Sequence, residues 1–251
     1  MTEPHISVSG VSLAYRMSRN RAGTFKEYAI SLMRRQVEYE EFWALNDVSF
    51  DVHEGEVFAV VGPNGAGKST LMKAVAGILP PTKGRVVVRG TVSPLIEVGG
   101  GLNDELTGRE NIVVYGTMLG RDPDEMRERV DQVAGWAGLR QFLTVPVRSY
   151  STGMRARLAF SIATDLRPDV LLVDEILSVG DEDFRLKSFK RIRGMIDAGT
   201  TVLLVSHQLK QVEDLATRAM WLDHGNVKLF GDAAEVVDAY TEHVKATREQ
   251  N

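Results

Sequence analysis

Several features are missing from this sequence, and each absence excludes a class of protein. The 251 residues include no cysteine, which excludes disulfides and thiolate metal sites. No apolar run approaches the ~18 to 20 residues that a membrane-spanning helix needs. The first five residues show no basic region leading into an apolar core, so we expect no secretory signal. We therefore expect a cytoplasmic protein that reaches a membrane through a partner.

An excess of basic residues is also missing. The formal net charge is -4, with 30 Lys and Arg against 34 Asp and Glu, so we expect no nucleic-acid partner. A hydrophobic fraction of 43% and a charged fraction of 25% are typical of a soluble globular protein. Neither an internal repeat nor a low-complexity segment divides the chain. We expect a single domain over residues 1–251.

What is present is a phosphate-binding loop that fits G-x-x-x-x-G-K-[ST] in full. The apolar run at 57–61 predicts a buried strand before it, and residues 69–77 predict a helix after it. Glycines let backbone N–H groups converge on phosphate oxygens beside the positive end of the helix dipole. The residues predicted to bind the nucleotide are Gly62, Pro63, Asn64, Gly65, Ala66, Gly67, Lys68, Ser69 and Thr70.

Two of these residues have further predicted roles, and two more strands end in polar residues. Lys68 suits the β- and γ-phosphates, while the hydroxyl of Ser69 suits Mg²⁺. The run at 170–173 ends in Asp174, a predicted Mg²⁺ ligand, and Glu175, the predicted base for the attacking water. The run at 202–205 leads to His207, for which we expect a γ-phosphate contact.

The order of the apolar runs predicts an α/β fold. Runs at 57–61, 86–88, 170–173 and 202–205 alternate with helical patterns, as in a mostly parallel sheet covered by helices. The pattern between 102 and 166 is almost wholly helical, and 219–228 predicts a closing hairpin before a last helix from Asp232. Ser151 or Thr152 can cap the helix that follows Tyr150, and a capped helix start with a nearby glycine is itself an anion site.

Taken in order, GPNGAGKST, YSTGMRAR, VLLVDE and VSH resemble the nucleotide-binding subunit of an ABC transporter. The resemblance implies ATP hydrolysis with Mg²⁺, a P-loop core over about 1–96 and 167–251, and an inserted helical subdomain over about 97–166. It also implies a homodimer in which one chain's signature loop contacts the ATP of the other, and a membrane permease present in two copies. The implied signature residues are Ser151, Thr152, Gly153 and Met154, and Asp181 belongs to the implied D-loop.

Departures from the family pattern point to one subfamily of these ATPases. The signature keeps only the serine and one glycine of LSGGQ, and Glu97 stands where a Q-loop glutamine is usual. These departures, with the stretches 95–102, 105–111, 150–157 and 176–184, are similar to ATPases that export lipid-linked polysaccharides such as O-antigen, capsule and teichoic acid. The resemblance implies a peripheral subunit at the cytoplasmic face of the cell membrane. Such a subunit contacts the lipid-linked polysaccharide through the permease.

An insert at about 16–42 separates the opening strand, expected at 6–15, from the phosphate-loop strand. Its apolar residues at 25, 29, 32, 33 and 37 predict an amphipathic helix, and its basic residues include Arg34 and Arg35. Such a helix favours an anionic membrane surface or an acidic partner, so the insert is a second candidate contact for the lipid-linked substrate. The alternative is a helix packed on its own domain with solvated arginines.

The sequence does not decide which aromatic residue stacks on adenine. Tyr15 matches the family's aromatic position at the end of the first strand, whereas the insert can bring Phe42 or Trp43 there instead. We expect the ATPase subunit of a polysaccharide exporter. The alternatives are an ABC exporter of a drug, lipid or peptide, and an ABC-type ATPase that works outside transport. A P-loop GTPase or kinase is disfavoured because the sequence has no N-K-x-D motif.

Overall fold

The computed structural model describes residues 3–18, 39–96, 100–174 and 181–249. Its strands are β1 (Ile6–Ser18), β2 (Tyr39–Val52), β3 (Val57–Val61), β4 (Lys83–Val88), β5 (Val92–Leu95), β6 (Val170–Asp174), β7 (Thr201–Val205), β8 (Arg218–Asp223) and β9 (Asn226–Asp232). Its helices are α2 (Lys68–Val75), α3 (Gly108–Met118), α4 (Pro123–Ala137), α5 (Thr152–Ala163), α6 (Glu182–Asp197), α7 (Leu209–Leu215) and α8 (Ala233–Glu249), with 3₁₀ helices η1 (Arg140–Phe142) and η2 (Val147–Ser149). The predicted insert helix, Glu97 and Glu175 lie outside the described residues.

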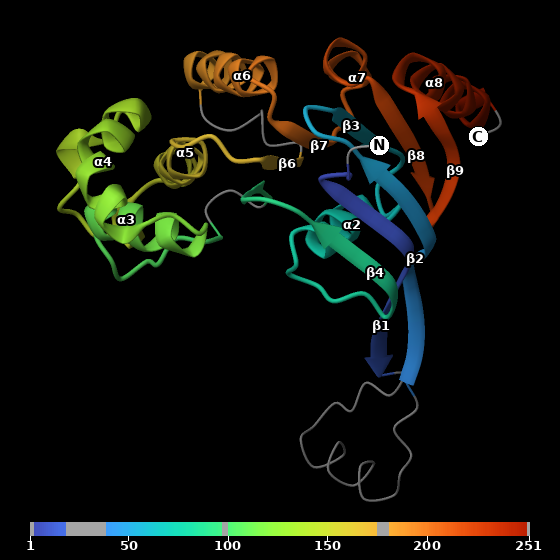
Figure 1. The fold of residues 1–251 in the computed structure, drawn as a ribbon, viewed down its shortest axis with the longest axis horizontal. Helices are drawn as coiled ribbons and strands as arrows, with labels where there is room; N and C mark the ends of the chain where they lie inside the picture. The colour runs from blue at the N-terminus through green and yellow to red at the C-terminus, as the bar shows by residue number, and fades with distance from the viewer. Residues whose placement is uncertain (1–2, 19–38, 97–99, 175–180, 250–251) are drawn as a thin grey trace, which may run out of the picture.

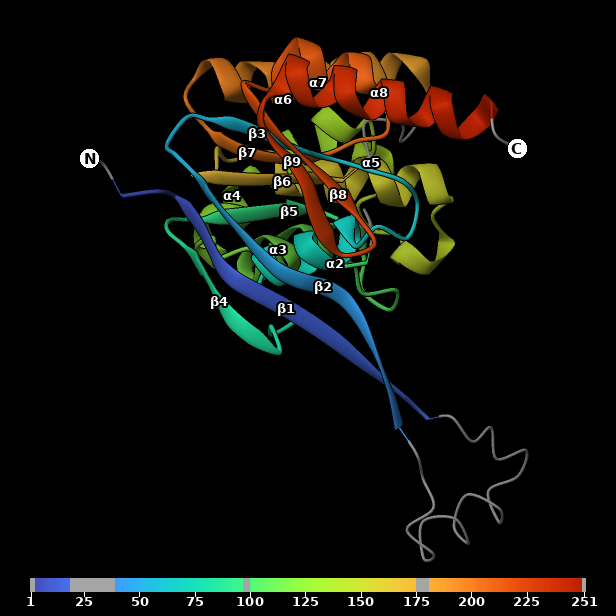
Figure 2. The same cartoon turned by 90° about the vertical axis from the view of Figure 1, so that its right-hand side faces the viewer.

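A six-stranded sheet forms the centre of the molecule, with strand order β5-β6-β7-β3-β8-β9. All neighbours in it run parallel except β9, which pairs antiparallel with β8 at the edge. Every residue of β3 and β7 is buried, which explains why these strands appear as unbroken apolar runs. Helices α6, α7 and α8 cover one face, and α2 lies on the other (Figures 1 and 2).

A second, three-stranded antiparallel sheet has the order β2-β1-β4. The apolar run at 86–88, expected in the parallel sheet, lies here in β4, where Val88 pairs with Ile6. Its valines are only half-buried, because an antiparallel sheet can keep one face open to solvent. The opening strand is also longer than expected, since β1 continues to Ser18 and pairs with β2 as far as Tyr39.

Two apolar clusters pack the faces of the central sheet. The first lies between the two sheets and α2, where Phe50 of β2 stacks on Phe58 of β3 with ring centroids 4.9 Å apart. The second joins the other face to α6, α7 and α8, and includes Phe184 and Val236. Because β3, β6 and β7 run parallel, their carboxyl ends lie at one edge of the sheet, which is where ligands bind in open α/β folds.

Helices α3, α4 and α5 form a lobe with a separate apolar core (Figure 1). Thr107 starts α3 with a capping box, in which its hydroxyl accepts from the Glu110 N–H and the Glu110 carboxylate accepts from Thr107. These hydrogen bonds from the Thr107 hydroxyl and N–H hold the pKa of Glu110 below its ordinary value. Asp122 caps α4 ahead of Pro123, and Gly138 ends it in the left-handed conformation.

A buried carboxylate joins this lobe to the core. Asp165 follows α5 with a side chain only 1% exposed, and it pairs with Arg129 of α4 and, at 3.7 Å, with Arg191 of α6. The Trp136 ring of α4 packs beside this cluster, stacked on Phe160 at a centroid distance of 5.4 Å. A buried charge is tolerated only when it is paired, so this cluster fixes how α4 and α6 sit together.

The predicted closing hairpin is present as β8 and β9, and α8 begins at Ala233, one residue after the expected start. Tyr240 of α8 packs on Trp221 of β8, with ring centroids 5.5 Å apart. None of the described helices is both long enough and apolar enough to cross a membrane.

Candidate nucleotide-binding site

The phosphate loop lies between β3 and α2 and is held by close backbone packing. Gly62, Gly65 and Gly67 all have positive φ angles, of 149°, 79° and 105°. A Cβ on Gly62 would lie 2.0 Å from the Leu222 carbonyl oxygen, and one on Gly67 would lie 2.4 Å from that of Ala44. Glycine is therefore required at 62 and 67 by both conformation and space.

The turn between β8 and β9 supports the loop from behind. The Gly225 N–H donates to the Ala66 carbonyl at 2.9 Å, and the Asn46 N–H of β2 donates to the Gly225 carbonyl at 2.9 Å. These bonds tie the phosphate loop to β2 and to the hairpin at once. No local sequence pattern predicts this contact, because the three segments are far apart along the chain.

Lys68 is the first residue of α2, and its side chain turns back over the loop. The residue is only 7% exposed, and its Nζ donates to the carbonyl oxygens of Gly62 at 2.8 Å and Pro63 at 2.9 Å. A buried ammonium needs hydrogen-bond acceptors, and phosphate oxygens are stronger acceptors than neutral carbonyls because they are charged. The position suits a lysine that binds a phosphate in front of the loop.

Ser69 and Asp174 meet across the edge of the sheet. The Ser69 hydroxyl in the first turn of α2 donates to Asp174 Oδ2 at the end of β6 over 3.4 Å. A hydroxyl and a carboxylate are oxygen ligands of the kind that Mg²⁺ prefers, and that ion keeps several water and phosphate ligands. These two side chains fit the predicted metal role. No group of three or more His, Cys, Asp or Glu that could hold a metal occurs among the described residues.

These side chains share one cavity of about 550 Å³. Its described lining consists of Tyr15, Phe42, Ala44, Asn64, Gly65, Gly67, Lys68, Ser69, Thr70, Asp174 and Val205. Most of the predicted nucleotide residues are therefore brought together. Gly62, Pro63 and Ala66 are not among the described lining residues; Gly62 and Ala66 are buried, and Pro63 is exposed.

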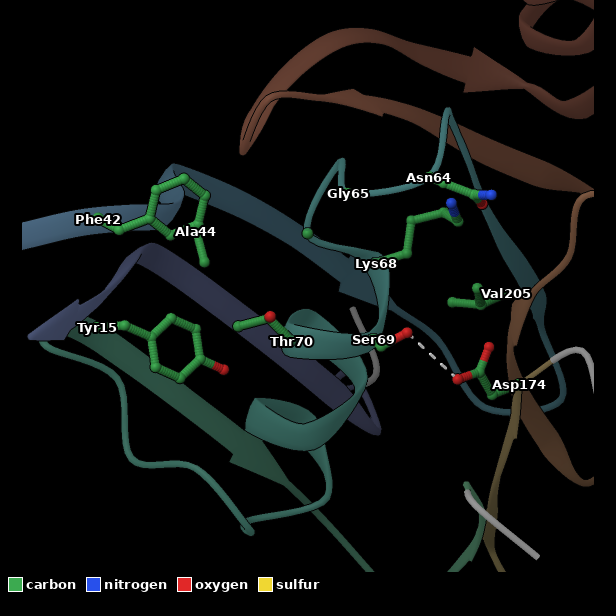
Figure 3. A pocket seen from close by; sticks show the side chains of 11 residues that line it. Tyr15, Phe42, Ala44, Asn64, Gly65, Lys68, Ser69, Thr70, Asp174 and Val205 are labelled. Carbon is green, nitrogen blue, oxygen red and sulfur yellow. Dashed lines mark hydrogen bonds between the residues drawn. The ribbon is translucent and has the colours of Figure 1, made fainter. Parts of the chain in front are cut away.

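Two aromatic rings lie at one end of the cavity, away from Lys68 (Figure 3). Tyr15 of β1 is 39% exposed and Phe42 of β2 is 52% exposed. Trp43 is not in the lining. The Lys83 ammonium lies over its half-buried ring, with Nζ 5.1 Å from the ring centroid. Of the three aromatic residues that the sequence left open, two face the cavity.

The signature residues lie on the helical lobe. Ser151 caps α5, its Oγ accepting the Met154 N–H at 3.2 Å, and both Ser151 and Thr152 are exposed. Gly153 and Met154 continue the first turn and are half-buried. None of the four appears among the described residues that line the cavity of the same chain.

Ion pairs that the sequence did not predict hold the signature segment in place. Arg155 pairs with Asp104 at 2.5 Å, and Arg148 pairs with Glu105 at 2.8 Å, so both sides of Ser151 are tied to the loop before α3. That loop is shaped by buried Asn111, whose side-chain amide donates to three backbone carbonyls and accepts one N–H. The pairs span more than 40 residues, which is why local patterns could not reveal them.

Asp181 lies at the start of α6, and His207 lies just beyond the end of β7. Asp181 caps α6 by accepting the Phe184 N–H at 2.9 Å, and it also pairs with Arg157 of α5, which links α6 to the signature helix. His207 is exposed two residues beyond β7 and is not among the described lining residues. Of the catalytic pair, Glu175 directly follows Asp174 but lies outside the described residues, as Glu97 does.

Comparisons with known proteins place these features in a family. The model of the ABC transporter family matches residues 45–178. An O-antigen export system ATP-binding protein of Klebsiella pneumoniae is 38% identical over 95% of this chain and 98% of its own length. A teichoic acids export ATP-binding protein of Bacillus anthracis is 42% identical over 85% of this chain, which spans 39% of that relative.

Solved structures agree at the level of the fold. A dimeric ATP-binding cassette in a post-hydrolysis state, bound to ADP and Pi, superposes with a TM-score of 0.71 at 21% identity, covering 91% of this chain and 98% of that one. An ATP-binding subunit of an ABC transporter gives the same TM-score at 23% identity, over 94% of this chain and 93% of its own. The predicted fold class is confirmed by these structures, and the predicted ATPase class is confirmed by the family match and the relatives named as ATP-binding proteins. This chain therefore belongs to the ABC transporter family.

Proposed function

We propose that this chain is the ATP-hydrolysing subunit of an exporter that moves a lipid-linked polysaccharide across the cytoplasmic membrane. The observation that carries the ATPase part is the single cavity that joins Lys68, Ser69 and Asp174. Support for the cargo comes from the relatives, which are named for O-antigen and teichoic acid export. The membrane permease and the location at the cytoplasmic face are part of the same proposal.

In this proposal the cavity binds ATP from base to γ-phosphate. Tyr15 contacts adenine, the loop N–H groups surround the phosphates, and Lys68 neutralises charge on the β- and γ-phosphates. Ser69 and Asp174 would hold Mg²⁺, which supplies electrostatic stabilisation of the phosphates. These groups orient the γ-phosphate toward the edge where β6 and β7 end.

Each cavity is half of a complete site. Ser151 and Gly153 reach the γ-phosphate bound by a second copy of the chain, which makes the working unit a homodimer with two equivalent sites. The exposed hydroxyl of Ser151 at a helix start supports this role, as does its separation from the cavity of its own chain. Asp181 supports the signature helix in this proposal, since it caps α6 and pairs with Arg157 of α5.

Hydrolysis needs a base for water and a contact that senses the γ-phosphate. Glu175 accepts the proton of the attacking water, and His207 contacts the γ-phosphate from the end of β7. The P–O bond to the leaving ADP breaks as the new bond to water oxygen forms. The Q-loop role of Glu97 stays a prediction from the sequence. The contact of the basic insert with the lipid-linked cargo also stays a prediction.

A Glu175→Gln variant tests the catalytic part. We expect ATP affinity within about threefold of the original and hydrolysis at least ~10²-fold slower, because the amide cannot accept the proton. Glu182→Gln, an exposed carboxylate at the start of α6, is the matched control and should hydrolyse ATP normally. Normal turnover in the Glu175 variant would exclude that residue from its role.

Copurification with the permease tests the cargo. We expect the assembled exporter to hydrolyse ATP faster when lipid-linked polysaccharide is added, and to respond less to the same lipid without sugar. Equal stimulation by the bare lipid or by apolar drugs would favour one of the other ABC exporters. Failure to assemble with any membrane protein would favour an ATPase outside transport.

A further inference from the structure

The end of the cavity at Tyr15, where the proposed function places the nucleobase, holds a second aromatic ring, that of Phe42. The family resemblance does not account for this second ring. Tyr15 and Phe42 are register partners across the antiparallel β1 and β2 pair. Directly opposite residues of such a pair project to the same face of the sheet, with Cβ atoms about 5 Å apart. Both rings therefore face the cavity together, as Figure 3 shows.

Phe42 is more exposed than a structural ring of its size should be. Its side chain is 52% exposed, whereas Phe50 on the same strand is 5% exposed and stacked in the core. An apolar ring that lies open to water inside a concave polar site is the usual form of a ligand contact. Phe42 contributes little to the core, so its position is explained better by what enters the cavity.

The strand geometry fixes where Phe42 lies. The β1 and β2 register shifts between Leu13 and Ala14, which leaves Ala44 as an extra residue in β2. Ala44 also lines the cavity, and its carbonyl oxygen lies against Gly67 of the phosphate loop. The ring of Phe42 is thus set at a fixed place relative to the phosphates.

Trp43 shows that this placement depends on strand alternation. It lies next to Phe42, but its ring is half-buried under the Lys83 ammonium and does not line the cavity. Successive side chains of a strand point to opposite faces. The pair therefore offers one aromatic residue in the site and a matched neighbour outside it.

We infer that Phe42 is a second base-contacting residue that, together with Tyr15, selects purine nucleotides by size. This inference rests on the proposed nucleotide site. A bicyclic purine is wide enough to contact both rings, whereas a single pyrimidine ring is not. Contacts through ring faces and edges tolerate different hydrogen-bonding patterns on the base, so adenine and guanine nucleotides should bind alike.

Nucleoside diphosphates with Mg²⁺ give a direct test, because they bind without being hydrolysed. Isothermal titration calorimetry with ADP, GDP, CDP, UDP and inorganic pyrophosphate separates the base from the phosphates. For the unaltered protein we expect ADP and GDP to bind within about threefold of each other and roughly 10-fold more tightly than CDP and UDP.

Phe42→Ala should weaken ADP and GDP binding about 10-fold, change CDP and UDP less than about threefold, and leave pyrophosphate unchanged. Phe42→Trp should restore the purine preference, and Phe42→Leu should fall between. Trp43→Leu is the matched control and should leave all five affinities within about twofold. Thermal unfolding of each variant verifies that the fold is retained.

Distinct outcomes separate this inference from the proposed function. If Phe42→Ala behaves like Trp43→Leu while Tyr15→Ala weakens ADP binding, the inference is wrong and the nucleotide site stands. An equal loss for pyrophosphate in Phe42→Ala would also overturn it, since the ring would then act on the phosphate loop. If the unaltered protein binds no ADP, the proposed function itself fails.

Discussion

Two helices in this chain begin at predicted phosphate contacts, and they begin in different ways. Helix α2 has Gly67 at its N-cap position, with a left-handed backbone and no side-chain cap, directly before the buried Lys68. Helix α5 has Ser151 at its N-cap position, where the exposed residue caps the helix with its hydroxyl. The first helix start is built into a cavity, whereas the second lies on the surface of a separate lobe.

In the proposed dimer, this difference separates the half of the site that folding supplies from the half that a partner chain supplies. The N–H groups ahead of α2 converge because glycines at 62 and 67 pack against two strands of the same chain. The first turn of α5 is complete in itself, so nothing in its own chain requires a phosphate there. Substitutions at the two helix starts should therefore affect different measurements.

The largest effect should come from Lys68→Ala. It removes the only positively charged side chain among the described residues that line the cavity, so we expect nucleotide affinity and hydrolysis to fall by about 10² to 10³. Calorimetry with Mg-ADP and a phosphate-release assay measure the two. Lys245→Ala, an exposed lysine of α8, is the control. Affinity within threefold of the original would contradict the site.

Substitutions at Ser151 should separate capping from phosphate binding. Aspartate caps a helix as well as serine does, so Ser151→Asp should keep its stability, yet its charge should slow hydrolysis about 10²-fold by repelling the partner's ATP. Ser151→Ala should lose about 1 kcal/mol of stability through the cap. Both Ser151 variants should bind nucleotide as the unaltered monomer does. Full activity in Ser151→Asp would leave the serine as a cap alone.

A pair of glycine substitutions includes the smallest expected effect, at Gly153, and gives the cleanest contrast between the two helix starts. Gly67→Ala places a Cβ against a backbone carbonyl at positive φ, so we expect it to lose about 2 to 4 kcal/mol of unfolding free energy. Gly153 has open space around it, since an added Cβ would lie 4.0 Å from the Ser151 Oγ, so Gly153→Ala should change the unfolding free energy by no more than about 0.5 kcal/mol. Urea unfolding measures both, and equal losses would remove the contrast.

The sequence predicted the parts of the site that depend on local pattern. The phosphate loop, the strand ending in Asp174 and the closing hairpin are all visible as short periodic segments, and the structure contains them. Packing between distant segments had no such signal. The extra residue in β2 that places Phe42 beside Tyr15 is one case, and the pairing of Arg157 with Asp181 is another.

The placement of the valines at 86–88 was wrong for a related reason. Three valines in a row are typical of a buried parallel strand, but β1 provides an antiparallel neighbour for them through Ile6 and Val88. Apolar content alone cannot say which sheet a strand joins, since either environment can bury part of it. The choice was made by a strand 80 residues earlier in the chain.

The hairpin turn behind the phosphate loop has a consequence for energetics. Gly225 connects the loop to β2 through two backbone hydrogen bonds, so the loop takes its curved shape when the protein folds. A preorganised loop loses little conformational entropy when a nucleotide arrives. In the proposed dimer, the free energy of nucleotide binding is then available to draw the two subunits together, whereas a loop that ordered itself on each binding event would use part of that free energy.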